Sequence, residues 1–293
     1  MSVQTPVQGA ETPKACETEM TERPWAIRAL PPFPAVALQL MSLLDEDDVA
    51  SKQVVNLLRI DPALSAEILR VSNSALYGLS RTIDSVSHAV VVLGSEAVKR
   101  LALTAALGRF ASGGSKSPSM RACWDHSVAT ALTAEKIAEE LGVSKDRCYT
   151  AGLLCDVGRL ALLTSNPNEY AGMLEVVREN DFDELECERQ LFDIDHCAAG
   201  DHLAKQWNLP GDIREAIAHH HGRSPGEPGA LSVCCAATLV ADELGYHVVE
   251  RETSPSIADA LQPLPFPNHQ AAAELLENYS EVISSALATI SPR

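Results

Sequence analysis

The sequence predicts an all-α protein, for two reasons. From Leu30 onward, apolar residues recur at the three- and four-residue spacings of helices, and they almost nowhere alternate with the two-residue period of a half-buried strand. Hydrophobic residues make up 46% of the 293 residues, which is enough to bury a substantial core without disulfides or structural metal. We therefore expect one large helical domain or two small ones.

The net charge narrows the choice of partners. Asp and Glu total 40 against 23 Lys and Arg, so the formal net charge is −17, which repels nucleic-acid phosphates and anionic membranes at long range. No apolar run approaches the roughly 20 residues of a membrane-spanning helix. The first 25 residues also lack the pattern of a signal peptide. We therefore expect a cytoplasmic protein that binds neither nucleic acid nor membranes.

The eight cysteines are scattered and form no C-x-x-C pair. Several lie within helical patterns beside Ala, Leu and Val, which favours reduced, buried thiols over a disulfide framework. Cys234 and Cys235 are adjacent, and we interpret them as helix-packing residues, since strained vicinal disulfides are rare.

Composition divides the chain into segments. Residues 1–24 are polar and lack periodicity, which predicts a flexible tail. The segment SGGSKSPS at 112–119 separates two helical halves of one domain, expected at about 25–111 and 120–245. Residues 246–293 are expected to form an irregular, proline-rich crossing and then a C-terminal helix that packs on the domain.

Local signals place individual helices. Asp61 followed by Pro62 predicts a helix start, because Asp caps a helix and Pro fits its first position. Gly94 and Ser95 end one helix and begin the next. In the second half we expect helices at 120–141, 146–164, 167–179, 195–208, 210–221, 230–244 and 270–288.

Several of these helices carry an ionisable side chain on their apolar face. Asp156 follows the helical spacing of the leucines in 146–164, and His196 shares a face with Leu203 and Trp207. His220 and His221 come three and four residues after the inward Ile217, so at least one of them should point inward. His126 precedes the inward run of its helix by one turn.

Burying an unpaired carboxylate or imidazole costs several kcal/mol, so these side chains are expected to meet one another. Two arrangements satisfy that demand. One is a metal site, because imidazoles and a carboxylate suit a first-row divalent ion that acts on a phosphate ester. The other is a metal-free cluster in which Asp156 accepts hydrogen bonds from histidines and backbone donors.

Longer motifs resemble a known family. The sequence resembles the HDOD domain, a bacterial signalling module related to the HD phosphohydrolases, over most of residues 26–245. The resemblance rests on LPPFPAVALQLMSLL, LLRIDPALSAEILRVSNSALYGLSRTIDSVSHAVVVLGSEAVKRLAL, WDHSVATALTAEKIA, AGLLCDVGRLAL, IDHCAAGDHLAKQWNLP and AIAHHHG. It implies a domain of two helical halves.

The resemblance also shows where the catalytic pattern breaks. The His-Asp pair of the catalytic relatives is Cys155-Asp156 here, and Thr238 stands where they have a closing aspartate, although Asp242 follows one turn later. The resemblance thus implies no catalytic residues and no metal or other cofactor, with a single divalent ion as the alternative, since cysteine binds zinc. It makes seven residues vestigial ligand positions: His126, Cys155, Asp156, His196, His220, His221 and Thr238.

We therefore expect a non-catalytic regulatory module of bacterial signal transduction. It would act through partner signalling proteins, through a homo-oligomer surface, or through a small ligand such as a nucleotide. The alternative is a metal-dependent phosphohydrolase of a signalling nucleotide, with Asp156 as the core metal ligand.

Overall fold

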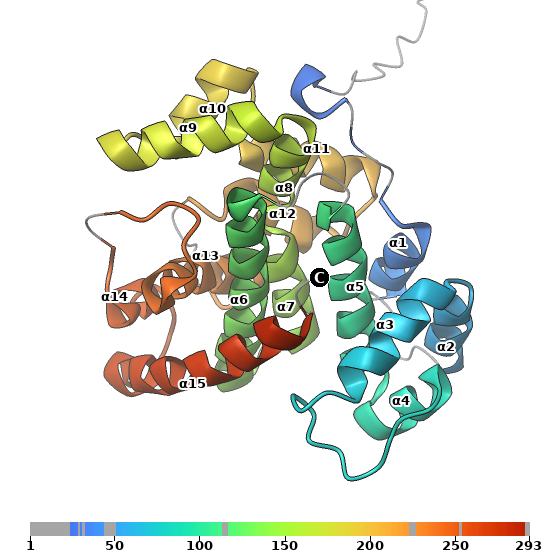
Figure 1. Cartoon of the computed structure of the whole chain (residues 1–293). Helices are drawn as coiled ribbons and strands as arrows, with labels where there is room; N and C mark the ends of the chain where they lie inside the picture. Colours follow the sequence, from blue (N-terminus) through green and yellow to red (C-terminus); the bar gives the residue numbers. More distant parts are fainter. Residues whose placement is uncertain are drawn as a thin grey trace, which may run out of the picture.

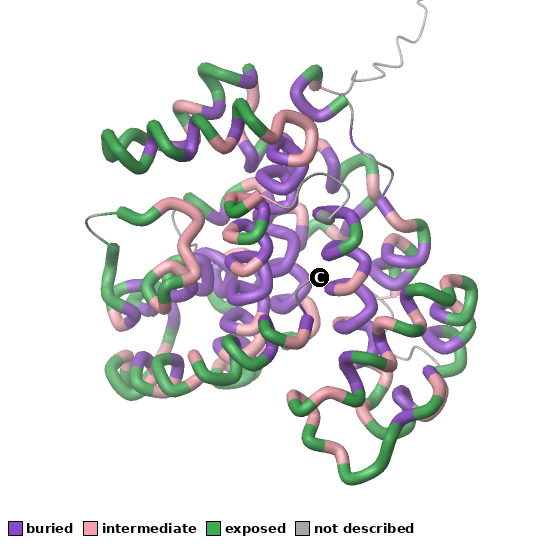
Figure 2. The backbone as a smooth tube through the Cα atoms, in the orientation of Figure 1, coloured by how far each residue is buried: buried purple, intermediate pink, exposed green. Residues whose placement is uncertain are grey.

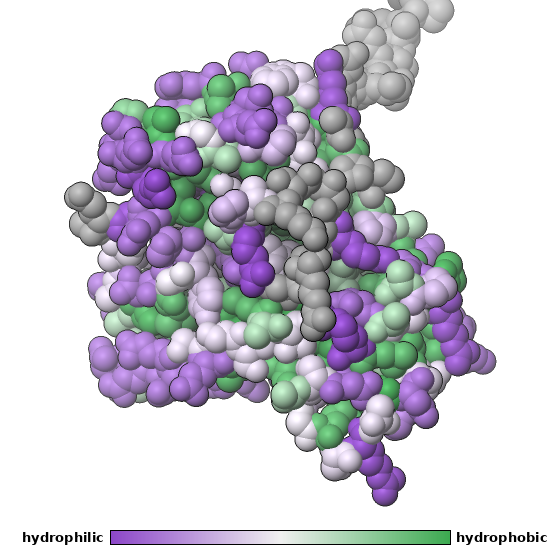
Figure 3. Space-filling view, viewed as in Figure 1, coloured by the Kyte–Doolittle hydropathy of each residue, from purple (hydrophilic) through white to green (hydrophobic). Residues whose placement is uncertain are grey.

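The computed structural model describes residues 24–28, 30, 33–43, 51–112, 117–222, 227–251 and 254–290. Within these ranges every regular element is a helix, which confirms the all-α prediction (Figure 1). The predicted tail at 1–24 lies outside the described residues except for Pro24. Hydrophilic residues cover much of the face in Figure 3, as the acidic composition leads one to expect.

The N-terminal half packs around its own apolar cluster, which contains Leu58, Leu64 and Ile68. Its helices are α1 (Ala35–Ser42), α2 (Ser51–Arg59), α3 (Pro62–Ser72), α4 (Val86–Leu93) and α5 (Ser95–Ser112). The start of α3 is as predicted, because the Asp61 carboxylate accepts a hydrogen bond from the Leu64 amide at 2.9 Å. Helix α5 is the helix of this half that faces the second half (Figure 1), and it contacts helices of both halves.

The second half is built around deeply buried helices at its centre (Figure 2). It consists of α6 (Pro118–Leu141), α7 (Lys145–Leu154), α8 (Val157–Ser165), α9 (Pro167–Asn180), α10 (Glu184–Phe192), α11 (His196–Gln206), α12 (Gly211–His219) and α13 (Ala230–Ala241). Seven described cysteines are free, and six of them are buried, which agrees with the expectation of reduced thiols.

Two helix predictions in this half are wrong, and one helix was not predicted. The helix expected at 146–164 is two helices, because the backbone leaves α-helical geometry at Asp156, where φ is −93° and ψ is 18°. The helix α10 was not predicted, because buried glutamates interrupt its apolar pattern. The helix expected at 230–244 ends at Ala241 and continues as a π-helical turn, Asp242–Tyr246, in which Gly245 has φ 90°.

The C-terminal region crosses back over the domain. The segment expected to be irregular contains one short helix, α14 (Ile257–Leu261), before the final helix α15 (His269–Ile290). Helix α15 packs on α6 and α14, and near its end the Thr289 carbonyl accepts a hydrogen bond of 2.7 Å from Arg70 of α3. None of the helices described here is long and apolar enough to cross a membrane.

Helices α8 and α11 approach closely where Gly158 and Gly200 face each other. A Cβ on Gly158 would overlap the carbonyl oxygen of His196 and lie 2.6 Å from the Gly200 amide nitrogen. A Cβ on Gly200 would lie 2.6 Å from a methyl group of Ile217. The two glycines therefore fix the distance between Asp156, at the start of α8, and His196, at the start of α11.

Gly158→Ala should therefore lower the free energy of unfolding by about 1–3 kcal/mol or more, because the helices must separate. Gly172→Ala on α9 is the matched control, since a Cβ there meets nothing within 4 Å. Better helix propensity should make that variant equal to the wild type or more stable by up to about 1 kcal/mol. Chemical denaturation measures both, and equal effects at the two positions would contradict the tight crossing.

Candidate functional site

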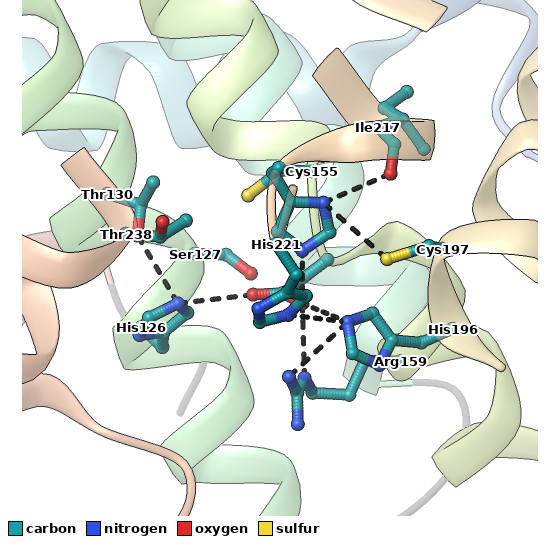
Figure 4. Close-up of polar contacts among 12 residues, drawn as sticks. His126, Ser127, Thr130, Cys155, Arg159, His196, Cys197, Ile217, His221 and Thr238 are labelled. Carbon is teal, nitrogen blue, oxygen red and sulfur yellow. Dashed lines mark hydrogen bonds and ion pairs between the residues drawn. The ribbon is translucent and has the colours of Figure 1, made fainter. Parts of the chain in front are cut away.

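Four of the predicted side chains come together in the interior of the second half, and Figure 4 labels two of them, His126 and His196. His126 comes from the middle of α6, and Asp156 lies at the break between α7 and α8. His196 is the first residue of α11, and His220 follows the end of α12. All four are buried, with relative exposures between 0% and 5%. Asp156, His196 and His220 thus lie at helix ends that meet in the interior.

The Asp156 carboxylate is the centre of the group. Its Oδ2 lies 3.2 Å from Nε2 of His126, and its Oδ1 lies 3.5 Å from Nε2 of His196. The same Oδ1 is 3.5 Å from Nε2 of His220. The structure therefore places one buried carboxylate among three imidazoles, as the sequence pattern predicts.

The three buried imidazoles share one orientation. Nδ1 of His126 lies 2.9 Å from the Tyr246 carbonyl oxygen, and Nδ1 of His220 lies 3.0 Å from the Ile217 carbonyl oxygen. Nδ1 of His196 lies 2.8 Å from the Glu188 carboxylate. Since carbonyl and carboxylate oxygens only accept, each Nδ1 carries a proton, and each Nε2 is turned toward Asp156.

A buried arginine, absent from the sequence-based prediction, completes the cluster. Arg159 is 3% exposed, and its Nε donates to Asp156 Oδ1 at 3.1 Å. Its Nη1 donates to Glu184, and its Nη2 lies 3.5 Å from Nε2 of His196. The signal in the sequence was the position of Arg159, three residues after Asp156 among leucines and alanines. The carboxylate that would be a core metal ligand therefore already has a cation bound to it.

The substituted position Cys155 has a neutral thiol. Its Sγ donates to the Gly152 carbonyl at 3.1 Å and belongs to a small apolar cluster with Ala151 and Cys234. Contact with Cys234 and burial raise the pKa of Cys155 well above its usual value. The sulfur still lies within 4.8 Å of ligand atoms of Asp156 and His220, but as a thiol it is a weak ligand.

The closing position also lacks a carboxylate. Thr238, on α13, is buried, and its hydroxyl donates to the Cys235 carbonyl at 3.0 Å. Asp242 lies in the π-helical turn, with Oδ1 3.3 Å from Nδ1 of His126. Asp242 thus contacts Nδ1 of His126, whereas Asp156 contacts Nε2 of the same ring. Asp242 and Asp156 therefore lie on opposite sides of the His126 ring.

The negative charge of the Asp156 carboxylate is compensated by the guanidinium of Arg159 and by protonated imidazoles. Burial would raise the pKa of Asp156, but Arg159, His126 and His220 together hold it well below its usual value. Burial would lower the pKa of His220, but the contact with Asp156 raises it to about 10. Burial would likewise lower the pKa of His196, but the Glu188 carboxylate raises it well above its usual value.

His221 differs from the other imidazoles. The residue as a whole is exposed, and its Nε2 lies 2.9 Å from Nε2 of His196. Burial of the ring, together with the positive charges on His220 and His196, lowers the pKa of His221 well below its usual value. We conclude that His221 is neutral and accepts a hydrogen bond from His196.

A cavity of about 450 Å³ opens beside the cluster. Its walls include the imidazoles of His126, His220 and His221 and the side chains of Thr238 and Arg251. Pockets of roughly 300–1,000 Å³ hold small molecules in proteins. A small ligand therefore has both room and polar partners beside the buried cluster.

Three groups among the described residues place metal-binding atoms within 4.8 Å of one another. One contains Asp156 with Cys155 and His220, and the other two lie around His196. The Asp156 group offers few anionic ligands for the pair of cations that two-metal phosphoesterases use. Its thiol is protonated, its carboxylate is bound by Arg159, and Thr238 contributes no negative charge.

Fold and cluster together define an all-α protein with a buried His-Asp site between its helices. The chain belongs to the HDOD family, since the model of the HDOD domain matches residues 30–223. That range takes in most of the predicted domain and every vestigial position except Thr238.

Similar proteins are bacterial. An HDOD domain protein of unknown function from Geobacter sulfurreducens is 26% identical, with a TM-score of 0.75 over 89% of this chain and 93% of that one. A candidate phosphohydrolase from Shewanella amazonensis SB2B is 20% identical, with a TM-score of 0.71 over 92% and 99% of the two chains. The second of these similarities concerns the fold alone.

Two further proteins are longer than this chain. A candidate signal transduction protein from Marinobacter aquaeolei VT8 is 23% identical, with a TM-score of 0.69 over 90% of this chain and 60% of that one, and it shares the fold. An uncharacterized protein of Treponema pallidum (strain Nichols) is 25% identical over 194 residues. That match covers 66% of this chain and 37% of the length of the Treponema protein.

Arg159→Met should lower the free energy of unfolding by about 3–5 kcal/mol, because it leaves Asp156 and Glu184 as buried carboxylates without their shared cation. Arg189→Met is the matched control, since Arg189 pairs with Glu186 and Asp195 at the surface. Removing those pairs should cost about 0–1 kcal/mol. Urea denaturation compares the two variants, and an Arg159→Met protein as stable as the wild type would show that the guanidinium is not the needed counter-charge.

Proposed function

We propose that this chain is a regulatory module of signal transduction that works by binding and does not hydrolyse phosphate esters. The observation that carries the proposal is the contact between Arg159 and Asp156, 3.1 Å long and buried. A guanidinium is permanently charged and cannot activate a water molecule as a metal ion does. The site thus keeps its positive charge and lacks the chemistry that a metal ion would supply.

The binding role has two supports in the structure. The cavity of about 450 Å³ brings solvent to the imidazole cluster and has Arg251 in its wall, which favours an anionic small ligand such as a nucleotide. Helix α5 contacts helices of both halves, so a partner signalling protein or a second copy of the chain that binds beside α5 would act on both halves at once. The excess of acidic residues disfavours nucleic acid and membranes as partners. We propose the bacterial cytoplasm as the setting.

A metal-dependent phosphohydrolase of a signalling nucleotide is the second candidate. It is favoured by one observation, the convergence of three Nε2 atoms on the Asp156 carboxylate beside an open cavity. It requires that metal ions displace the guanidinium of Arg159 from Asp156 and recruit ligands in place of Cys155 and Thr238.

The regulatory module and the phosphohydrolase can be distinguished by whether the chain hydrolyses a signalling nucleotide. The purified chain, incubated with a panel of cyclic dinucleotides and alarmones in Mn²⁺ or Fe²⁺, should release no product above the protein-free blank. Cys155→His, which restores the imidazole, should also be inactive, because Arg159 and Thr238 remain. Metal-dependent turnover that disappears in Asp156→Ala would overturn the regulatory proposal.

A ligand of the cavity should raise the midpoint of thermal unfolding. At 100 times its dissociation constant a ligand stabilises the folded state by about 2.7 kcal/mol. We expect an anionic nucleotide to produce such a shift in the wild type and a smaller one in Arg251→Ala, since Arg251 lines the cavity. Arg189→Ala, at a surface position outside the cavity lining, should keep the full shift. Equal shifts in both variants would place the ligand elsewhere.

A further inference from the structure

We propose that an outward face of α4 binds an acidic amphipathic helix of a partner protein. This face, called the α4 face, consists of Ser87, Val91 and Val92 of α4, with Arg59 at the end of α2 and Ile60 directly after it. It lies on the N-terminal half, outside the histidine cluster and the lining of the main cavity. The inference rests on the proposed binding role, for which it names a surface and a class of partner.

The α4 face exposes apolar side chains to solvent. Val91 is 82% exposed and Val92 is 45% exposed. Among the described residues, Val91 and Ile60, which is 70% exposed, are the most exposed large hydrophobic side chains. Both belong to the same pair of packed helices, α2 and α4. Single apolar residues are common on a protein surface, but a group of them marks a site of interaction.

The fold itself does not require valine at the exposed positions. The inward side of α4 is formed by Ala89 and Val90, which are buried in the apolar cluster that also contains Val98 and Ala102 of α5. Outward valines gain little from burial, and their β-branched side chains lower helix propensity below that of Ala, Glu or Lys. Valine at 91 therefore lowers the stability of the free helix, and contact with a partner accounts for its presence.

Arg59 adds a positive charge beside these valines. Its Nη2 donates to the Ser87 hydroxyl at 3.1 Å, and Ser87 lies one helical turn before Val91 on the same side of α4. Acidic residues outnumber basic ones by 40 to 23 in this chain, yet Arg59 forms no ion pair with a described carboxylate. Asp84, just before α4, pairs with His88 instead, at 3.2 Å. The guanidinium of Arg59 is therefore available to a partner.

Charge and hydropathy together define the partner. The exposed valines fit apolar side chains, and Arg59 fits a carboxylate. Lys52, seven residues before Arg59 and on the same side of α2, extends the positive charge along the face. A helix with leucines on one side and carboxylates beside them satisfies both requirements. The net charge of −17 repels such a helix at long range, so its binding depends on the short-range contacts of the α4 face.

A partner on the α4 face would act on the second half through α5. Helix α4 packs on α5, and α5 contacts α6, α7 and α8. In Figure 1, α4 lies at the outer end of the N-terminal half, apart from α6 to α13. The α4 face could therefore hold a partner while the main cavity, whose lining includes His126, stays open to a small ligand.

A fluorescent peptide tests the α4 face in the full chain. The peptide contains only leucine and glutamate, with leucine at the i, i+3, i+4 and i+7 spacing of one helix side. Fluorescence anisotropy should show saturable binding to the wild type. Val91→Glu and Arg59→Glu should each weaken binding by at least about 10-fold, because each places a carboxylate against the carboxylates of the peptide. Val176→Glu and Arg178→Glu, at exposed positions of α9, are the matched controls and should bind like the wild type.

Val91→Glu should fold like the wild type, because the position is exposed and Glu is the better helix former. Absence of peptide binding to the wild type, or equal binding to the wild type and Val91→Glu, would overturn the proposal. Photo-crosslinking in the native cell through Val91→benzoylphenylalanine should capture an acidic, apolar segment of another protein. Crosslinks only to a second copy of the chain would replace that partner by self-association. No result depends on turnover, so failure here leaves the regulatory proposal to its own test.

Discussion

The buried carboxylate of Asp156 is the constraint on which the second half of the molecule depends. An ionised carboxylate in the interior costs several kcal/mol unless cations and hydrogen-bond donors surround it. Here the compensation comes from Arg159, on the next turn of the chain, and from imidazoles on three other helices. Helices α6, α8, α11 and the end of α12 therefore meet around one charge.

The same requirement extends outward through a second layer of carboxylates. Glu184 pairs with Arg159, and Glu188 pairs with His196 and accepts from the Tyr170 hydroxyl. Both glutamates belong to α10, which lies at the edge of the half and whose sequence has no clear apolar stripe. Each buried cation thus requires a buried anion, and the need to pair them holds α10 against the domain.

The proposed regulatory function rests on how the charge of Asp156 is compensated within the protein. Metal ions supply positive charge to a cluster of carboxylates and imidazoles, and loss of a ligand would otherwise leave Asp156 uncompensated. Arg159 and the protonated imidazoles supply that charge internally. The cavity beside the cluster then remains available for recognition.

The sequence by itself determined the helical class, the family and the inward residues Asp156, His196 and His220, because helical spacing and motif identity are properties of the chain. It also predicted, from the resemblance, that Cys155 and Thr238 stand where catalytic relatives have metal ligands, and this stays a prediction. Only the tertiary structure decided that α7 and α8 separate at Asp156, that Glu184 reaches Arg159, and that Arg59 reaches Ser87. The physical reason is that charge pairing and ligand geometry depend on which helix ends meet, and residues far apart in the chain set those contacts.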